Sequence, residues 1–163
     1  MNPAMESATG PLRLHEVNVP ADWVDYNGHM NDSRYMQLSS ETGDVFLHLI
    51  GMDGAYLASG RSFFTVESHL VYISQAYAGD HLYVTVQLLA HDQKRLRIFT
   101  SIHRASDDSL VATAEHMMLH VDTAVGKASP AGAEVLASLD GIARHHSQLP
   151  LPAQAGRSIG QPP

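Results

Sequence analysis

The side chains best suited to chemistry lie close together early in the sequence. A polar run that begins at Asp25 supplies a carboxylate, two amides, the imidazole of His29 and, at Gly28, a position without a Cβ atom. Apolar residues at helical spacing follow at once, so we expect this run to lead into the N-terminus of a helix. The first N–H groups of a helix have no partner within it and favour negative charge. Such a junction favours anions and developing oxyanions.

The same residue types also form ordinary turns. Gly28 permits a positive φ and a close approach of a ligand to the backbone, but Asn, Asp and Gly favour tight turns for local reasons as well. Asn31, Asp32 and Ser33 are all good N-caps, so a helix should start near them. The residue types alone leave a simple turn and a reactive loop both open.

Length and composition limit the classes of protein to consider. The 163 residues suit one domain with a real core, and the formal net charge of −7 argues against general nucleic-acid binding, which needs a basic surface. Cysteine is absent, which excludes disulfides, thiolate metal sites and a cysteine nucleophile. The sequence shows no apolar run long enough to span a bilayer and no signal pattern in residues 1–14, so we expect a soluble, cytoplasmic protein.

The 11 histidines lack the spacing of metal ligands. His145 and His146 lie near a polar tail, whereas His103, His116 and His120 fall in strand-like segments without an H-E-x-x-H or similar arrangement. We therefore expect structural or surface roles for them, and we expect no metal.

Hydrophobic periodicity shows which elements must position the polar run. Three- and four-residue steps indicate helices, and period-two alternation between short polar turns indicates antiparallel strands. One strand, one long helix and a meander make an α+β fold in which the sheet buries one face on the helix. The expected elements are a strand over residues 12–19, a helix over 33–50, strands over 61–73, 81–90, 95–103 and 110–122, and a short helix over 131–145.

Two features of this pattern carry further expectations. Gly43 inside the long helix should cost about 1 kcal/mol relative to alanine, which suggests that something packs closely against the backbone there. One helix cannot cover both faces of a five-stranded sheet, and the second face would carry several large apolar residues. We therefore expect a homodimer or a homotetramer built as a dimer of dimers. The apolar residues of that second face are Phe63, Val71, Ile73 and Phe99, whereas Phe64, Val66, Leu70 and Tyr72 share the opposite parity.

The two ends of the chain differ from its middle in composition. Residues 1–11 are small, polar and proline-containing, and we expect a flexible N-terminus. Pro, Gly, Gln and Ser dominate residues 147–163, which predicts a disordered tail. One domain over residues 12–146 remains.

The order of elements resembles the hot-dog fold, in which a five-stranded antiparallel sheet wraps a long central helix. The run Trp23 to Asn31, followed by Arg34 and Tyr35, resembles the loop signature of acyl-CoA thioesterases of the 4-hydroxybenzoyl-CoA thioesterase type. A closer similarity is to the betainyl-CoA thioesterases of carnitine degradation, which also occur fused to carnitine dehydrogenase; it is carried by residues 23–30, 60–69 and 92–95. The resemblance implies hydrolysis of a short acyl-CoA, betainyl-CoA above all, with no cofactor beyond the CoA thioester that is the substrate.

This resemblance implies roles for the loop residues. Asp25 matches the aspartate that acts as nucleophile or general base, and Asn27 and His29 match polar positions that hold the carbonyl or a water. Backbone N–H groups at the start of the helix would stabilise the oxyanion, where one donor contributes roughly 10²–10³ in rate. The candidates for that contact are Gly28, Met30 and Asn31.

Two comparisons within the fold family bear on the choice of base. Related plant acyl-carrier thioesterases use a glutamate on the second strand, where this chain has Gln75. Another branch places a carboxylate in the central helix, which makes Glu41 a rival base. We rank Glu41 below Asp25, because acids in the middle of a helix are usually solvated or bonded to neighbours.

Substrate contacts follow from the chemistry of the expected ligand. A betainyl group is a quaternary ammonium, which aromatic faces hold best. The candidates are Trp23, Tyr26, Tyr56, Phe64 and Tyr72, each of which could instead pack in the core. Lys94, Arg95 and Arg97 share one bend and could bind the CoA phosphates, although a solvated hairpin explains them equally well.

Two other functions remain as alternatives. Hot-dog hydratases pair an aspartate with a histidine five residues on, whereas Asp25 and His29 are four apart. A non-catalytic acyl-CoA-binding module would bind CoA esters tightly without turnover. It would share the fold, so measured turnover must separate it from the enzyme.

Overall fold

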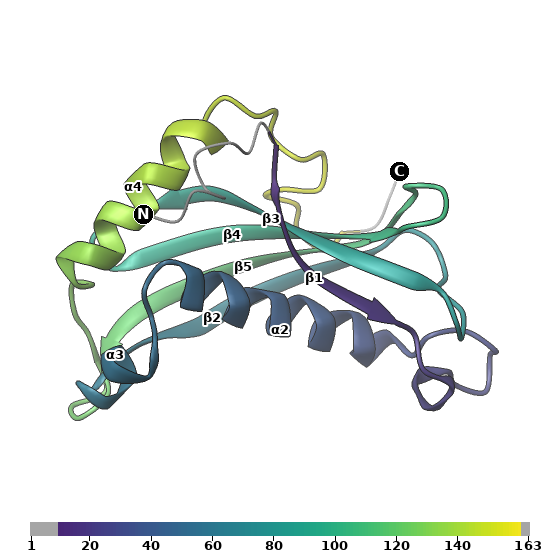
Figure 1. Cartoon of the computed structure of the whole chain (residues 1–163), viewed down its shortest axis with the longest axis horizontal. Helices are drawn as coiled ribbons and strands as arrows, with labels where there is room; N and C mark the ends of the chain where they lie inside the picture. The colour runs from purple at the N-terminus through teal and green to yellow at the C-terminus, as the bar shows by residue number, and fades with distance from the viewer. Residues whose placement is uncertain (1–9, 161–163) are drawn as a thin grey trace.

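The computed structural model describes residues 10–160 (Figure 1). The helices and strands expected from the sequence are present, with small shifts of their ends, and three short elements were not predicted. In chain order the elements are β1 (Leu12–Asn18), the 3₁₀ turn η1 (Ala21–Trp23), α2 (Asp32–Leu49), α3 (Gly54–Ala58), β2 (Arg61–Tyr72), β3 (His81–His91), β4 (Arg95–Arg104), β5 (Leu110–Asp122), β6 (Lys127–Ala128) and α4 (Ala133–His146).

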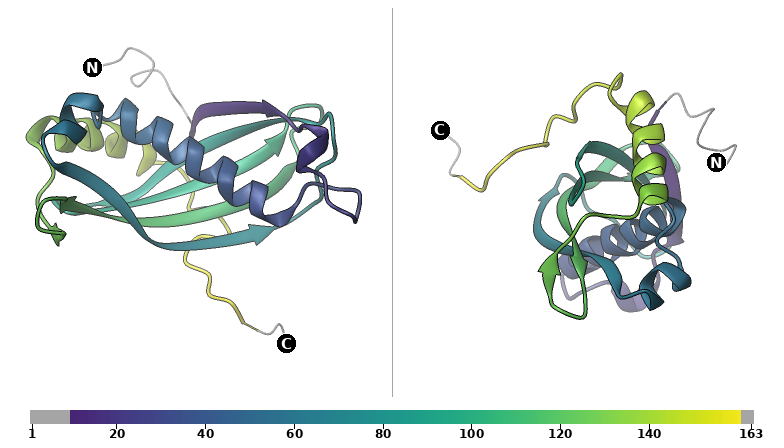
Figure 2. Two further views of the ribbon diagram at one scale, coloured as in Figure 1. Left: turned by 90° about the horizontal axis from the view of Figure 1, so that it is seen from below. Right: turned by 90° about the vertical axis from the view of Figure 1, so that its left-hand side faces the viewer.

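The five long strands form one antiparallel sheet in the order β1-β3-β4-β5-β2, with the short β6 paired to β5. The sheet curls, and α2 runs along its concave side, as Figures 1 and 2 show from different directions. This arrangement confirms the expected α+β hot-dog fold. In this order, β1 and β2 are the two edge strands of the sheet.

The sequence of α2 explains both its start and its packing. Asn31 caps the helix, since its Oδ1 accepts the backbone N–H of Ser33 at 3.0 Å. The buried stripe of the helix, which includes Leu38 and Phe46, faces the sheet. A Cβ atom on Gly43 would lie 3.5 Å from Cε of Met118 on β5, an ordinary contact distance, so side chains of the sheet pack against this glycine but leave room for an alanine.

A β-bulge in β2 changes which residues face the helix. The register with β5 shifts between Thr65 and Glu67, so the side-chain alternation of β2 changes phase there. Phe63 was expected on the face away from α2, and that expectation is wrong, because Phe63 is only 7% exposed and belongs to the core under the helix. Phe64 and Val66 are 49% and 58% exposed.

The outer face of the sheet is covered in part by the end of the chain itself. Phe99 is 2% exposed and pairs across the sheet with Gln87 on one side and Glu115 on the other. The Gln87 side-chain amide donates to the carbonyl oxygen of Pro150 at 3.2 Å, and Glu115 accepts the N–H of Gly156 at 2.6 Å. Residues 147–160, for which the sequence predicts disorder, therefore cross this face, while residues 1–9 and 161–163 lie outside the described part.

Candidate active site

A cavity opens beside the polar run singled out in the sequence. Its volume is about 490 Å³. It is bordered by the loop between η1 and α2, by the first turns of α2 and by the end of β2 with the segment that follows. The bordering residues are Asp25, Tyr26, Asn27, His29, Met30, Asn31, Asp32, Tyr35, Tyr72, Ile73, Ser74 and Gln75.

The loop closes on itself through backbone hydrogen bonds. The N–H of Asp25 donates to the carbonyl of His29 at 3.1 Å, and the N–H of Gly28 donates to the carbonyl of Asp25 at 3.0 Å. Oδ1 of Asp25 accepts the N–H of Asn27 at 2.8 Å, and Gly28 has a φ of +82°. The turn and the candidate site are thus the same structure: local turn chemistry holds the Asp25 carboxylate at the mouth of the cavity.

A second segment holds the loop from behind. Met30 is 2% exposed, and its N–H donates to the carbonyl of Ala76 at 2.7 Å. The N–H of Ala76 in turn donates to the hydroxyl of Tyr35 at 3.1 Å. Burial raises the pKa of Tyr35, so this hydroxyl stays protonated.

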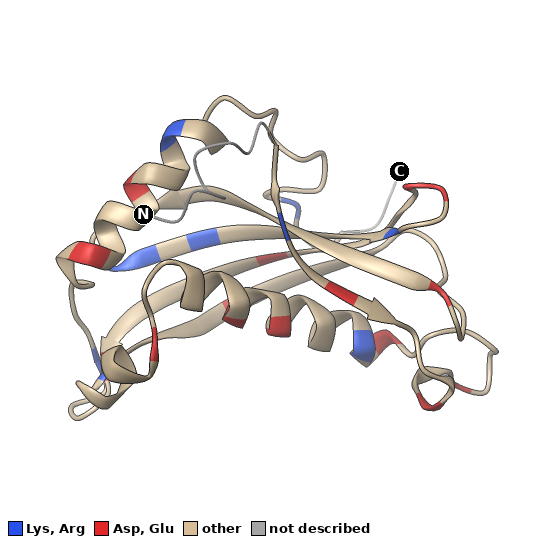
Figure 3. Ribbon diagram, in the orientation of Figure 1, with Lys and Arg blue, Asp and Glu red and all other residues tan. Residues whose placement is uncertain are grey.

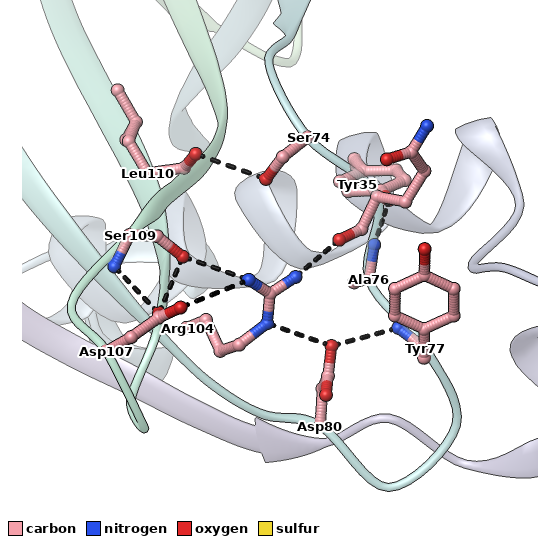
Figure 4. Close-up of polar contacts among 10 residues, drawn as sticks. Tyr35, Ser74, Ala76, Tyr77, Asp80, Arg104, Asp107, Ser109 and Leu110 are labelled. Atoms are coloured by element: carbon pink, nitrogen blue, oxygen red, sulfur yellow. Dashed lines mark hydrogen bonds and ion pairs between the residues drawn. The ribbon is translucent and has the colours of Figure 1, made fainter.

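Arg104 on β4 fixes the segment that contains Ala76 (Figure 4). Its guanidinium donates to Oδ2 of Asp80 at 3.1 Å, to Oγ of Ser109 at 3.0 Å and to the carbonyl oxygen of Gln75. Asp107 lies 3.7 Å from the same guanidinium. The sequence contained no local signal for this role, because Gln75 and Asp80 lie more than twenty positions before Arg104.

The predicted oxyanion donors differ in availability. The N–H groups of Gly28, Met30 and Asn31 all donate to backbone carbonyls within the protein. Within residues 10–160, the N–H groups of His29 and Asp32 have no such partner, although both residues border the cavity. These two groups therefore have no hydrogen-bond acceptor among the described residues.

The candidate aromatic residues separate into two groups. Tyr26 and Tyr72 border the cavity, as does Tyr35, which the sequence analysis did not select and whose ring meets that of Tyr72 edge-on at 5.4 Å. Trp23 and Phe64 do not border it. Trp23 packs beside the core and lies under the Arg34 guanidinium at 5.4 Å, whereas Phe64 lies on β2 and is half exposed.

Tyr56 belongs to α3, which lies at the opposite end of α2 from the loop (Figure 1). Its side chain has a hydrogen-bond network of its own. Its hydroxyl contacts Nε2 of His120 at 2.7 Å and accepts the N–H of Gly132 at 3.0 Å. The structure thus gives Tyr56 a part in joining α3, β5 and the start of α4, away from the cavity.

The basic residues proposed for CoA phosphates also lie far from the loop. They sit on or beside the β3–β4 turn, whereas the Asp25 loop adjoins the other end of β3, roughly 30 Å away along the strand. Arg95 pairs with Asp92 at 2.5 Å, and Arg97 pairs with Glu115. The Lys94 N–H and the Arg95 side chain stabilise the Asp92 carboxylate and lower its pKa to about 2. A single chain therefore does not bring Lys94, Arg95 and Arg97 to the cavity.

The helix α2 carries both acidic and basic side chains (Figure 3), and Glu41 is one of the acidic ones. Oε1 of Glu41 accepts the Gln37 side-chain amide at 2.8 Å, and Glu41 does not border the cavity. No three His, Asp or Glu side chains gather as metal ligands in residues 10–160. In the same described range, no helix is both long and apolar enough to cross a membrane.

Residues 19–139 match the family described as the thioesterase-like superfamily. An L-carnitine dehydrogenase/betainyl-CoA thioesterase of Rhizobium meliloti is 51% identical over 94% of this chain, which spans only 31% of that longer protein. A betainyl-CoA thioesterase of Pseudomonas aeruginosa is 39% identical over 93% of this chain and 96% of its own length.

A solved structure agrees with these sequence relatives. A protein of Pseudomonas putida KT2440, described provisionally as a thioesterase, is 33% identical with a TM-score of 0.81, and the match covers 94% of this chain and 99% of that one.

Proposed function

Since the chain belongs to the thioesterase-like superfamily, we propose that it hydrolyses acyl-CoA thioesters, with betainyl-CoA as its main substrate and betaine and CoA as products. The observation that carries this proposal is the cavity at the Asp25 loop. The cavity is lined by the Asp25 carboxylate, by backbone N–H groups without a hydrogen-bond acceptor in the protein, and by three tyrosines. The likeness to a betainyl-CoA thioesterase over nearly its whole length supports the choice of substrate.

The loop geometry suggests how the reaction proceeds. The Asn27 N–H holds one oxygen of the Asp25 carboxylate, and the other oxygen has no partner among the described residues. That oxygen attacks the thioester carbonyl or takes a proton from the attacking water. The N–H groups of His29 and Asp32 stabilise the negative charge on the carbonyl oxygen, and such a contact strengthens as the charge develops. On the general-base route, the proton taken from water goes to the departing CoA sulfur. On the nucleophilic route, the carbon–sulfur bond breaks to leave an anhydride on Asp25 and a CoA thiolate, and water then hydrolyses the anhydride.

The side chains around the cavity suit a quaternary ammonium. Tyr26, Tyr35 and Tyr72 offer aromatic faces or edges, and Asp25 and Asp32 add negative charge. A cation over an aromatic face gains about 0.5–2 kcal/mol, more where water is excluded. Of the aromatic residues selected from the sequence, Tyr26 and Tyr72 stay in this proposal, with Tyr35 added, because the other three do not border the cavity.

The test is release of CoA from a panel of thioesters, measured with a thiol-reactive dye. Because the chain has no cysteine, the dye reports only liberated CoA. The matched substrate is 3,3-dimethylbutyryl-CoA, which has the shape of betainyl-CoA with carbon in place of the charged nitrogen. We expect kcat/KM for betainyl-CoA to be at least about 10-fold higher, equivalent to about 1.4 kcal/mol of cation binding.

The outcomes separate the parts of the proposal. Equal turnover of the charged and neutral esters would remove the cation site and leave a thioesterase of other specificity, for which acetyl- and 4-hydroxybenzoyl-CoA complete the panel. Binding without CoA release from any ester would overturn the enzyme and favour an acyl-CoA-binding module.

The assembly is part of the same proposal. Phe64 and Val66 on the edge strand β2 and Val45 on α2 expose apolar surface, which supports a homodimer that pairs through this edge. Lys94, Arg95 and Arg97 could then bind the CoA of a neighbouring subunit. Sedimentation equilibrium should show a dimer or a tetramer, and a Val66→Lys variant should shift it toward monomer. The cytoplasmic location also remains a prediction, which cell fractionation would test.

A further inference from the structure

The cavity at the Asp25 loop has a buried inner end. Of the residues that border the cavity, only Met30 and Tyr35 are buried, at 2% and 3% exposure. The other lining residues are exposed or partly exposed, and Tyr72 and Ile73 are 52% and 44% exposed. The inner end of the cavity therefore lies at Met30 and Tyr35, and the CoA part of a bound thioester would leave on the exposed side.

The same two residues also belong to the core. Met30 and Tyr35 pack in one buried cluster with Leu38 of α2 and with apolar side chains of the sheet. The sheet residues of this cluster include Leu82 and Val84 on β3, Ile102 on β4 and Ala112 on β5. Met30 and Tyr35 thus lie between the cavity and an apolar interior.

The protein holds these two side chains in different ways. The hydroxyl of Tyr35 accepts the N–H of Ala76 at 3.1 Å, which fixes the far end of the ring. The side chain of Met30 is unbranched, and its thioether is only a weak hydrogen-bond acceptor. The main chain of Met30 is nevertheless held, because its N–H donates to the carbonyl of Ala76 at 2.7 Å and the residue pairs with Val24 in a β-bridge. A shorter side chain at Met30 would therefore leave the backbone contacts of the loop in place.

An acyl group bound for the proposed reaction would point toward this inner end. Its carbonyl oxygen would lie at the N–H groups of His29 and Asp32, and Met30 follows His29 directly in the chain. Because the CoA part needs the exposed side, the acyl chain extends the other way. The betainyl group suits such a closed end, since it is short and finishes in a broad trimethylammonium.

We infer that Met30 determines the length of the acyl group: its side chain closes the inner end of the cavity and restricts turnover to short acyl chains. This inference rests on the proposed thioesterase function. Met30→Ala removes about three non-hydrogen atoms beside the apolar cluster. The new space suits an aliphatic chain and offers no partner to a cation. The variant should therefore gain activity on longer straight-chain esters and gain none on betainyl-CoA.

The test compares kcat/KM for butyryl-CoA and hexanoyl-CoA, measured by release of CoA from the full chain. In the wild type, hexanoyl-CoA should be at least about 10-fold poorer, because its additional methylene groups meet the closed end. In Met30→Ala, the ratio of hexanoyl- to butyryl-CoA turnover should rise at least about 10-fold over the wild type. Each buried methylene contributes about fourfold, and two of them become accommodated.

A buried methionine elsewhere in the core provides the matched control. Met118 on β5 is 5% exposed, packs in the other core cluster and does not border the cavity. Met118→Ala removes the same atoms from the core, so its ratio of hexanoyl- to butyryl-CoA turnover should equal that of the wild type. Met30→Val shortens the side chain less, and its ratio should rise at least about fourfold. Melting curves show which variants are folded.

The outcomes separate this inference from the function on which it rests. If the wild type releases CoA from no ester, the proposed function fails and the inference fails with it. If the wild type is active but hydrolyses hexanoyl-CoA as well as butyryl-CoA, the inference alone fails, and no variant needs to fold for this result. An unchanged ratio in folded Met30→Ala or Met30→Val, or an equal rise in Met118→Ala, would also overturn it.

Discussion

The polar side chains near the two ends of α2 differ in their hydrogen bonding: those at one end are bonded within the protein, and those at the other end are not. At the far end, Nδ1 of His120 donates to the carbonyl of Ser129 at 2.8 Å, so Nε2 accepts the hydroxyl proton of Tyr56, which itself accepts the N–H of Gly132. At the loop end, the side chains of Asn27 and His29 have no hydrogen-bond partner within the described residues.

The backbone at the loop end is nevertheless well held, by the hydrogen bonds of Asp25, Gly28 and Met30. The fold thus fixes the main chain of the loop and leaves the side chains of Asn27 and His29 free of hydrogen bonds to the described residues. At the other end of α2, the polar groups bond to one another and stabilise the fold. Substitutions should therefore affect turnover at one end and unfolding at the other.

The largest effect should come from Asp25→Asn. The amide keeps the size of the side chain and its contact with the Asn27 N–H but cannot act as base or nucleophile, so kcat/KM should fall about 10³-fold or more. The free energy of unfolding should change by less than about 0.5 kcal/mol. Asp22→Asn on η1 is the control, because Asp22 does not border the cavity. Comparable activity of the two variants would show that Asp25 is neither the base nor the nucleophile.

Arg104→Gln should affect both properties, because it links the fold to the loop. The Arg104 side chain is 18% exposed, and its loss leaves Asp80 and the carbonyl of Gln75 without their main partner. Breaking such a partly buried pair should cost about 2–3 kcal/mol in urea unfolding. KM should rise as the segment around Ala76 loosens. The control is Arg13→Gln, whose side chain is 48% exposed and whose pairing with Glu16 should contribute less than about 1 kcal/mol.

Arg104 and the bulge in β2 also show where sequence reasoning stops. Helix and strand boundaries were predictable because hydrophobic periodicity and caps are local, and the Asp25 loop was found from its residue types and family signature. Phe63 was assigned to the wrong face because the extra residue at the bulge reverses the side-chain alternation of β2 on one side of the bulge relative to the other. Tyr35, Tyr56 and Arg104 take their roles from partners distant in sequence, which no local pattern reveals.

Stability should decrease when the pH falls below neutrality. Burial lowers the pKa of His116, His120 and His146, so the unfolded chain, with histidine pKa values near about 6.5, binds more protons than the folded one. Stability is therefore fully present above about pH 6.5 and is lost as the pH falls toward the folded pKa values. Each histidine contributes up to about 1.4 kcal/mol per pH unit. Urea unfolding between about pH 7 and pH 5 measures this slope, which His120→Gln should reduce; a flat profile in the wild type would contradict it.

The smallest effect should come from Tyr56→Phe, which removes one hydroxyl from the hydrogen-bonded network at the end of α2 away from the loop. Removing the hydroxyl leaves Nε2 of His120 and the N–H of Gly132 without their partner, at a cost of about 1–2 kcal/mol in the free energy of unfolding. Activity should stay near wild type, because Tyr56 does not border the cavity. For stability the matched control is Tyr26→Phe, since Tyr26 is 97% exposed and its hydroxyl contacts no described residue. If Tyr56→Phe lowered kcat/KM while leaving stability unchanged, Tyr56 would have to act on the substrate, and the division between the two ends of α2 would fail.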